Sequence, residues 1–153
     1  MRTVVQRVRR AAVRVDGETV GEVGIGLLLL VGVERGDTSR DAQATAQKIA
    51  KMRVFPGRTP MDQCVTDLGG SCLVVSQFTL AAAIRKGNRP SFTAAADPED
   101  AEPLYLEVAS ALEALGITVA KGQFGADMEV ELVNDGPATF LVSVRDGAVY
   151  DLP

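Results

Sequence analysis

The sequence predicts a single α/β domain over residues 1–153, with a mixed, barrel-like β-sheet layered against two main helices in the order ββ-(βα)2-βββ. Apolar residues make up 46% of the 153-residue chain, which is enough to close one hydrophobic core. Strand-like stretches fill both ends of the chain, and two stretches with helical spacing interrupt its middle. No repeat, low-complexity segment or linker divides the sequence.

The N-terminal segment favours a hairpin followed by a buried strand. Residues 2–15 alternate as one long strand, and Asp16-Gly17 is typical of a hairpin turn. Residues 19–23 should then pair back on this strand. The apolar run 26–33 fits a strand buried on both faces, and we expect it at the centre of the sheet.

A helix and a turn-rich segment come next. Thr38 begins the helix through a Thr-x-x-Asp cap, and apolar residues recur at helical spacing until Arg53. This helix should cover the sheet. Residues 54–70 are rich in proline and glycine, so they predict turns and at most one short strand over residues 64–68.

The second strand-helix unit begins with a predicted strand over residues 72–80 and a loop over residues 81–96. Asp97-Pro98 begins a helical region, with Pro103 in the first turn of the main helix, and Gly116 ends it. The buried stripe of this helix is expected at Leu104, Val108, Ala111, Leu112 and Leu115.

The C-terminal part predicts three closing strands, over residues 117–121, 128–133 and 138–144.

Neither a membrane span nor an export signal is expected. The longest apolar stretch, residues 25–33, contains two glycines and is about half of the roughly 20 residues that cross a bilayer. The N-terminus lacks an apolar region followed by a cleavage site. Cys64 and Cys72 match neither a zinc pair nor a redox motif, so we expect two reduced thiols in a cytoplasmic protein.

The chain contains no histidine, which narrows the chemistry. Histidine is the usual base that activates a Ser or Cys nucleophile and a frequent metal ligand. Its absence excludes a Ser-His-Asp triad and a Cys-His dyad, and a zinc site would need carboxylates and two thiols. We therefore expect no metal and no cofactor, and any hydrolysis must use other groups.

The formal charge of −4 argues at first against a nucleic-acid partner. The distribution is uneven, however, because residues 1–15 hold five Arg and no acid, and residues 84–92 hold three further cations. This pattern predicts either a basic, RNA-facing surface on an acidic body or a solvated surface with uneven charge.

Three short segments carry specific residues at turns in the predicted fold. The first, Ser76-Gln77-Phe78-Thr79-Leu80, ends the strand over residues 72–80, where alternation would place Gln77 and Thr79 on one face. The second is Gly122-Gln123-Phe124-Gly125-Ala126-Asp127-Met128, and the third is Asn134-Asp135-Gly136-Pro137. Taken one at a time, the residues of these segments fit a structural role equally well.

Taken together, these segments resemble the D-aminoacyl-tRNA deacylase family, as do residues 1–8 and the stretch Arg85-Lys86-Gly87-Asn88-Arg89-Pro90-Ser91-Phe92. The resemblance covers nearly the whole chain. It implies a cytoplasmic homodimer that hydrolyses the ester between tRNA and a D-amino acid or glycine, with two active sites at the subunit interface. Residues 55–63 and 81–84 depart from the family's usual pattern, which puts the rim of the site in question.

The resemblance also assigns residues to roles. Ser76, Gln77, Phe78 and Thr79 would line the catalytic wall, and Phe124 and Met128 would complete the pocket near the terminal adenosine of tRNA. Gly136-Pro137, expected to be cis, would reach into the partner's site and exclude an L side chain. The residues expected to bind tRNA phosphates are Arg7, Arg9, Arg85, Lys86 and Arg89. No DNA or membrane partner is implied.

An aminoacyl ester is already activated, so positioning and oxyanion stabilisation could suffice for its hydrolysis. We favour attack by water assisted by the substrate's own ribose 2′-OH, with backbone N–H groups near Phe78 and Thr79 holding the negative charge. Thr79 as a covalent nucleophile is an alternative mechanism. A non-catalytic tRNA-binding module and a structural dimerisation domain are the alternative functions.

Overall fold

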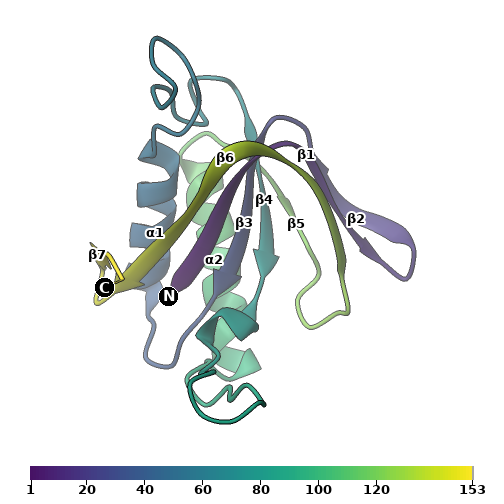
Figure 1. The fold of residues 1–153 in the computed structure, drawn as a ribbon, viewed down its shortest axis with the longest axis vertical. Coiled ribbons are helices and arrows are strands. Elements are labelled where there is room, and N and C mark those ends of the chain that lie inside the picture. The colour runs from purple at the N-terminus through teal and green to yellow at the C-terminus, as the bar shows by residue number, and fades with distance from the viewer. Residues whose placement is uncertain (153) are drawn as a thin grey trace.

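A computed structural model describes residues 1–152 and shows a curled sheet with two helices packed on one of its faces (Figure 1). The seven strands lie in the order β5-β4-β3-β1-β6-β7, and β2 pairs with β1 off this path. In chain order, the elements are β1 (Arg2–Val15), β2 (Glu18–Val23), β3 (Gly26–Gly32), α1 (Ser39–Lys51), β4 (Ser71–Ser76), the 3-10 helix η1 (Phe78–Ala81), α2 (Pro98–Ala114), β5 (Thr118–Lys121), β6 (Glu129–Arg145) and β7 (Ala148–Tyr150).

The sheet is mixed because its two halves are connected differently. β1 is antiparallel to β2, β3 and β6, and antiparallel strands can be joined without a crossover connection. β3, β4 and β5 are parallel to one another, so each connection must cross the sheet, and α1 and α2 provide these crossovers. The predicted α/β architecture with two helices is confirmed.

The main core lies between the sheet and the two helices, and a smaller apolar cluster lines the opposite face of the sheet. The apolar run of β3 contributes to both, because Leu27 and Leu29 face the helices whereas Leu28 faces the smaller cluster. Gly26 has to be glycine, since a Cβ there would collide with the backbone oxygen of Ser71 on β4. The expected central strand is therefore buried on both faces.

The helix starts follow local sequence signals. Thr38 and Asp41 form the expected capping box of α1, and both helices contribute to the main core. Neither helix of the described residues has an apolar run long enough to cross a bilayer.

The structure corrects the predicted start and stripe of the second helix. It begins at Pro98, so Pro103 lies in the second turn and not in the first, because Pro98 already occupies the first helical position. Val108, Ala111 and Leu112 are buried as predicted. Leu104 is half-buried, but Leu115 is 44% exposed because the helix has ended before it.

The strand predicted over residues 72–80 was wrong in extent. Residues 72–80 are not one strand, because β4 ends at Ser76 and the chain then turns into η1. Turns occupy residues 64–68 without a strand, which agrees with the prediction of turns and at most one short strand there. The chain nevertheless returns from this turn-rich region directly to the start of β4.

The closing strands number three, as predicted, but they are divided differently. The two strands predicted over residues 128–133 and 138–144 are one strand, β6, and β7 is the third. Gly136-Pro137 does not break β6, because the pairing with β1 shifts register between Gln6 and Arg10. Such an irregularity accommodates a proline, which has no N–H to donate to the ladder.

Candidate active site

A cavity of about 360 Å3 lies where β4 ends, between η1, the start of α2 and the loop after β5. Its walls are largely apolar, and it is open on one side. It is lined by Val31, Val33, Arg35, Ser76, Gln77, Phe78, Phe92, Ala95, Ala96, Asp97, Pro98, Ala101, Tyr105, Phe124 and Gly125. An apolar cavity with a few polar groups at its mouth is the usual form of a small-molecule site.

The sharp change from strand to 3-10 helix shapes the polar wall of this cavity. The Gln77 N–H still donates to Val31 O at 2.8 Å as part of the sheet, and the chain then turns, with Leu80 N–H bonded to Gln77 O at 3.2 Å. The predicted strand alternation of Gln77 and Thr79 is therefore wrong. Their side chains still meet, because Gln77 Nε2 donates to Thr79 Oγ1 at 2.5 Å in an exposed hydrogen bond.

A second, smaller cavity of about 290 Å3 lies on the other side of the same turn. It shares Ser76, Gln77 and Phe78 with the first cavity, and Met128 lies in its wall. Phe124 lines the first cavity and packs on Tyr105, with ring centroids 5.9 Å apart. The structure therefore brings Ser76, Gln77, Phe78, Phe124 and Met128 to one place, with Thr79 bonded to Gln77 beside them.

Tyr105, Arg35 and Phe92 line the first cavity, although none of them was assigned to the site from the sequence. Tyr105 is buried in the cavity wall and donates from its hydroxyl to Val74 O at 3.0 Å. Burial raises the pKa of Tyr105 to about 12, so the phenol stays neutral and cannot serve as a base near neutral pH. Arg35 pairs with Asp97 at 3.0 Å at the rim, and Phe92 packs edge-on to Phe78. Tyr105 had a sequence signal, since it precedes Val108 and Leu112 at helical spacing, and Phe92 ends the stretch that resembles the family, whereas Arg35 had no signal.

Gly136-Pro137 lies away from these cavities in the same chain. The Gly136-Pro137 bond is cis, as expected, and both residues are exposed. The motif lies opposite Gln6–Val8 of β1, which is level with residues 71–73 of β4, whereas the cavity begins at the far end of β4, at Ser76. Three to five residues of strand separate these levels, or roughly 10 to 17 Å, and β3 and β1 lie between β4 and β6. The motif therefore does not reach the cavity of its own chain.

The end of the sheet that carries Gly136-Pro137 is fixed by Arg7. Its Nε donates to Asp135 O at 2.9 Å, and its Nη1 donates to Val54 O at 2.7 Å. Arg7 also pairs with the Asp135 carboxylate at 3.2 Å. Arg7 is only 7% exposed, so we correct the expectation that it binds RNA phosphates.

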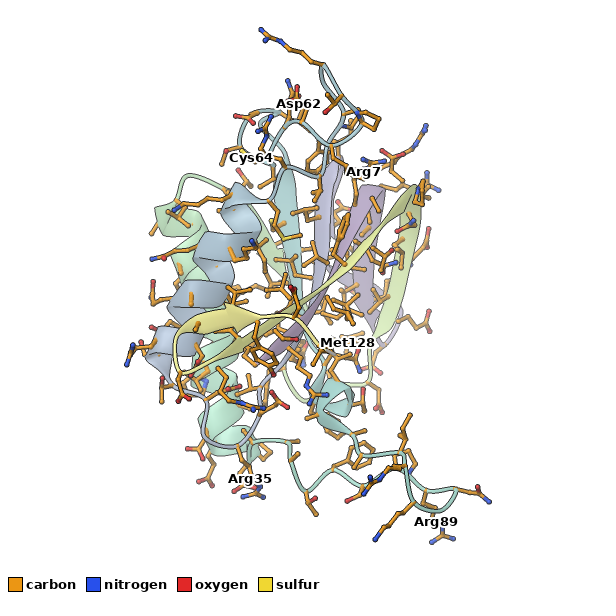
Figure 2. The ribbon with its side chains drawn as sticks, turned by 60° about the vertical axis from the view of Figure 1, so that its left-hand side comes forward. Arg7, Arg35, Asp62, Cys64, Arg89 and Met128 are labelled. Atoms are coloured by element: carbon orange, nitrogen blue, oxygen red, sulfur yellow. The ribbon has the colours of Figure 1, made fainter. Side chains whose placement is uncertain are left out.

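The remaining predicted phosphate-binding residues are exposed but lie at two opposite ends of the molecule. Arg9 is 74% exposed and reaches Asp135 only at 3.9 Å. Arg85, Lys86 and Arg89 lie on the loop after η1, and Figure 2 shows Arg89 at the opposite end of the molecule from Arg7. One chain therefore does not form the single basic surface that the sequence suggested.

Few side chains of the described residues are placed to bind a metal ion or to react as a thiol. Within residues 1–152, no three Cys, Asp or Glu side chains are grouped to hold a metal ion. Both cysteines are free thiols, and burial raises the pKa of Cys72 to about 12, which makes that thiol unreactive near neutral pH.

Comparison with known proteins gives a consistent result. The sequence model of the family described as D-Tyr-tRNA(Tyr) deacylase matches residues 4–143. Proteins named D-aminoacyl-tRNA deacylase from Halalkalibacterium halodurans and Paracoccus denitrificans are each 52% identical, over 95% and 97% of this chain and all of theirs.

Solved structures share the fold. One, titled c-Myc DNA Unwinding Element Binding Protein, aligns with a TM-score of 0.88 and 36% identity, covering 95% of this chain and 99% of that one. Another, from work on a probable eukaryotic D-amino acid tRNA deacylase, aligns with a TM-score of 0.76 over 92% of this chain and 97% of that one. At 15% identity, the second likeness concerns the fold alone.

Proposed function

This chain belongs to the D-Tyr-tRNA(Tyr) deacylase family, and on that premise we propose that it hydrolyses the ester joining a D-amino acid to tRNA. The cavity at the end of β4 is the main structural support for this function. Ser76, Gln77 and Phe78 lie on one side of it and Phe124 on the other, and the family resemblance points to these same residues. The relatives that share half of the sequence carry the deacylase name.

The chemistry needs no histidine. An aminoacyl ester is activated by its own leaving group, and the adjacent ribose 2′-OH can assist an attacking water, so the protein has to orient the ester and stabilise the oxyanion. The backbone N–H groups of Phe78 and Thr79 stand at the turn into η1, beside the cavity, and we assign them to the developing negative charge. Product release frees the D-amino acid and tRNA.

Thr79 supports this reaction without forming a covalent bond to the acyl group. Its hydroxyl accepts from Gln77 Nε2, and an amide is not a base that could remove the hydroxyl proton. Tyr105, which lines the cavity, donates its hydroxyl to Val74 O and remains neutral. Thr79 therefore positions Gln77, and water is the nucleophile.

Chiral selection requires a second copy of the chain. Gly136-Pro137 is exposed within β6, roughly 10 to 17 Å along the strands from the level of the cavity and with β1 and β3 between β6 and β4, so one chain cannot present both to one substrate. In a homodimer, the motif of one subunit closes the cavity of the other and leaves no room for an L side chain. Glycine has no side chain to exclude, so glycine on tRNA is also a substrate.

The tRNA is held through phosphates, and the reaction takes place in the cytoplasm, where aminoacyl-tRNA is made. Arg9, Arg85, Lys86 and Arg89 are the exposed cations that we assign to phosphate contacts. Because the whole chain has a net charge of −4, tRNA binding depends on these few exposed cations. The affinity for tRNA should therefore fall as the salt concentration rises.

The test is release of amino acid from D-Tyr-tRNA, L-Tyr-tRNA and Gly-tRNA by the purified protein. We expect release from the D and glycine substrates and retention of the L substrate. A Gln77→Trp variant, purified identically, fills the mouth of the cavity and should be inactive, which controls for contaminating hydrolases. Binding without release would make the chain a tRNA-binding module, and equal release of D- and L-Tyr would refute chiral selection.

A further inference from the structure

A loop over residues 82–92, called here the basic loop, stands at the mouth of the cavity. Ala83 and Ser91 close it with two backbone hydrogen bonds of 2.8 and 2.9 Å. Its end is fastened to the cavity wall, since Ala95 N–H donates to Phe92 O at 3.0 Å and Arg35 Nε to Thr93 O at 2.8 Å. The base of the loop is therefore fixed while its tip, with Arg89, extends away from the body (Figure 2).

The cations of the basic loop have no protein partner. Arg85, Lys86 and Arg89 are exposed, and no acidic residue occurs between residues 82 and 96. Across the described part of the chain, no ion pair includes any of the three. Such cations are suited to bind an external polyanion.

Exposed apolar side chains accompany these cations. Phe78 and Phe92 are 56% and 41% exposed, stand edge to face with centroids 5.1 Å apart and line the cavity. Ile84, at the start of the loop, is 74% exposed. Aromatic faces beside unpaired cations are suited to single-stranded nucleic acid, whose bases can stack on them. A duplex keeps its base faces stacked inside and offers only groove edges.

We propose, as an inference that rests on the deacylase function above, that the basic loop binds the unpaired 3′ strand of tRNA and not the acceptor duplex. The reach of the loop supports this choice. Phe92 is in the cavity wall, and Arg89 is three residues away, so at most about 11 Å of extended backbone separates them. With the terminal adenosine at the cavity, the cations face the phosphates of the nucleotides that directly precede it.

The experiment compares three D-tyrosyl esters: of adenosine, of the tetranucleotide ACCA and of tRNA. The test variant carries Arg85→Ala, Lys86→Ala and Arg89→Ala. The matched control carries Arg40→Ala, Lys48→Ala and Lys51→Ala, which removes three exposed cations from α1 and changes the net charge equally. Hydrolysis is measured as kcat/KM over a range of salt, and oligomeric state by analytical ultracentrifugation.

The loop variant should keep the wild-type rate on the adenosine ester, which has no phosphate, and lose about tenfold or more on the tetranucleotide ester at low salt. Its salt slope on that ester should be shallower by about 2, since each single-strand phosphate contact contributes about 0.7. The tRNA ester should show a similar loss. The control variant should match the wild type on all three esters.

Four results would overturn the inference. Loss on tRNA alone would place the cations on the duplex, and equal loss on all three esters would show that the loop supports the cavity itself. Dissociation of the loop variant into monomers would make the loop a subunit contact, and no loss at all would leave it without a role in binding. If the wild type cleaved none of the three esters, the deacylase function itself would fail. The wild-type rates therefore test that function separately from the role of the basic loop.

Discussion

Arg7 and the arginines of the basic loop have the same chemistry in the sequence and opposite environments in the structure. Arg7 is 7% exposed and donates to the backbone oxygens of Val54 and Asp135. Arg85 and Arg89 are exposed and, within residues 1–152, take part in no ion pair. The groups that face a cation therefore decide its role. One end of the sheet is fixed by internal bonds, and the other presents free groups to a ligand.

The largest effect on stability should come from Arg7→Ala. This change leaves Val54 O without its donor and the Asp135 carboxylate without its nearest cation, so unfolding in urea should require about 2 to 3 kcal/mol less free energy. Activity on D-aminoacyl-tRNA should also fall, because Asp135 directly precedes Gly136. Arg9→Ala is the matched control and should change stability by about 0.5 kcal/mol or less. Equal effects of the two changes would abolish the contrast between the buried and the exposed arginine.

Alkaline pH should lower the stability of the fold, because the buried side chains of Tyr105 and Cys72 lose protons there. Burial raises the pKa of Tyr105 from 10.0 to about 12 and that of Cys72 from 9.0 to about 12. Both groups therefore hold protons more tightly in the folded chain, so their stabilising contribution is complete below pH 9 and is lost as pH rises toward 12. Urea midpoints measured between pH 8 and 11 should decline. A flat profile would contradict the burial of these two groups.

A smaller change in stability should distinguish Tyr105 from Tyr150. Tyr105→Phe removes the hydrogen bond to Val74 O and should cost about 1 kcal/mol. Tyr150→Phe removes a hydroxyl that has no partner within residues 1–152, so stability should stay the same or rise slightly. Tyr105→Phe should retain hydrolysis, because the phenol is not a base. Loss of activity with normal stability would instead make Tyr105 a participant in the reaction.

The smallest change in stability is expected for Thr79→Ala, since this side chain is exposed and bonds only to Gln77. Hydrolysis of D-Tyr-tRNA should stay within about tenfold of the wild type, whereas a substrate with a 2′-deoxy terminal adenosine should be cleaved far more slowly. Complete loss of activity, or an acyl group trapped on Thr79 and seen by mass spectrometry, would make this residue the nucleophile.

Local signals in the sequence predicted the features that depend on a few neighbouring residues. The Thr38–Asp41 cap, the Asp16-Gly17 turn and the apolar run of β3 are of this kind, and each is found in the structure. The turn at η1 was missed because a single 3-10 turn has no periodicity that distinguishes it from the end of a strand. The continuity of β6 was missed because it depends on the irregular pairing with β1.

The candidate site was predictable only where motif residues meet in one chain. Ser76 and Phe124 were named from such motifs and line the same cavity. The burial of Arg7 was not predictable, because its partners Val54 and Asp135 are distant in the sequence. For the same reason, the separation of Gly136-Pro137 from the cavity could be found only from the register of β6, β1, β3 and β4.

Complementation between two inactive variants tests whether each active site combines the cavity of one subunit with the Gly136-Pro137 motif of the other. Gln77→Trp blocks the cavity, and Gly136→Phe places a bulky side chain at the exposed motif. Each homodimer should fail to hydrolyse D-Tyr-tRNA. After the two variants are unfolded and refolded together, mixed dimers contain one intact site, so activity should return to about a quarter of the wild-type value. A mixture no more active than either variant alone would contradict a site shared between subunits.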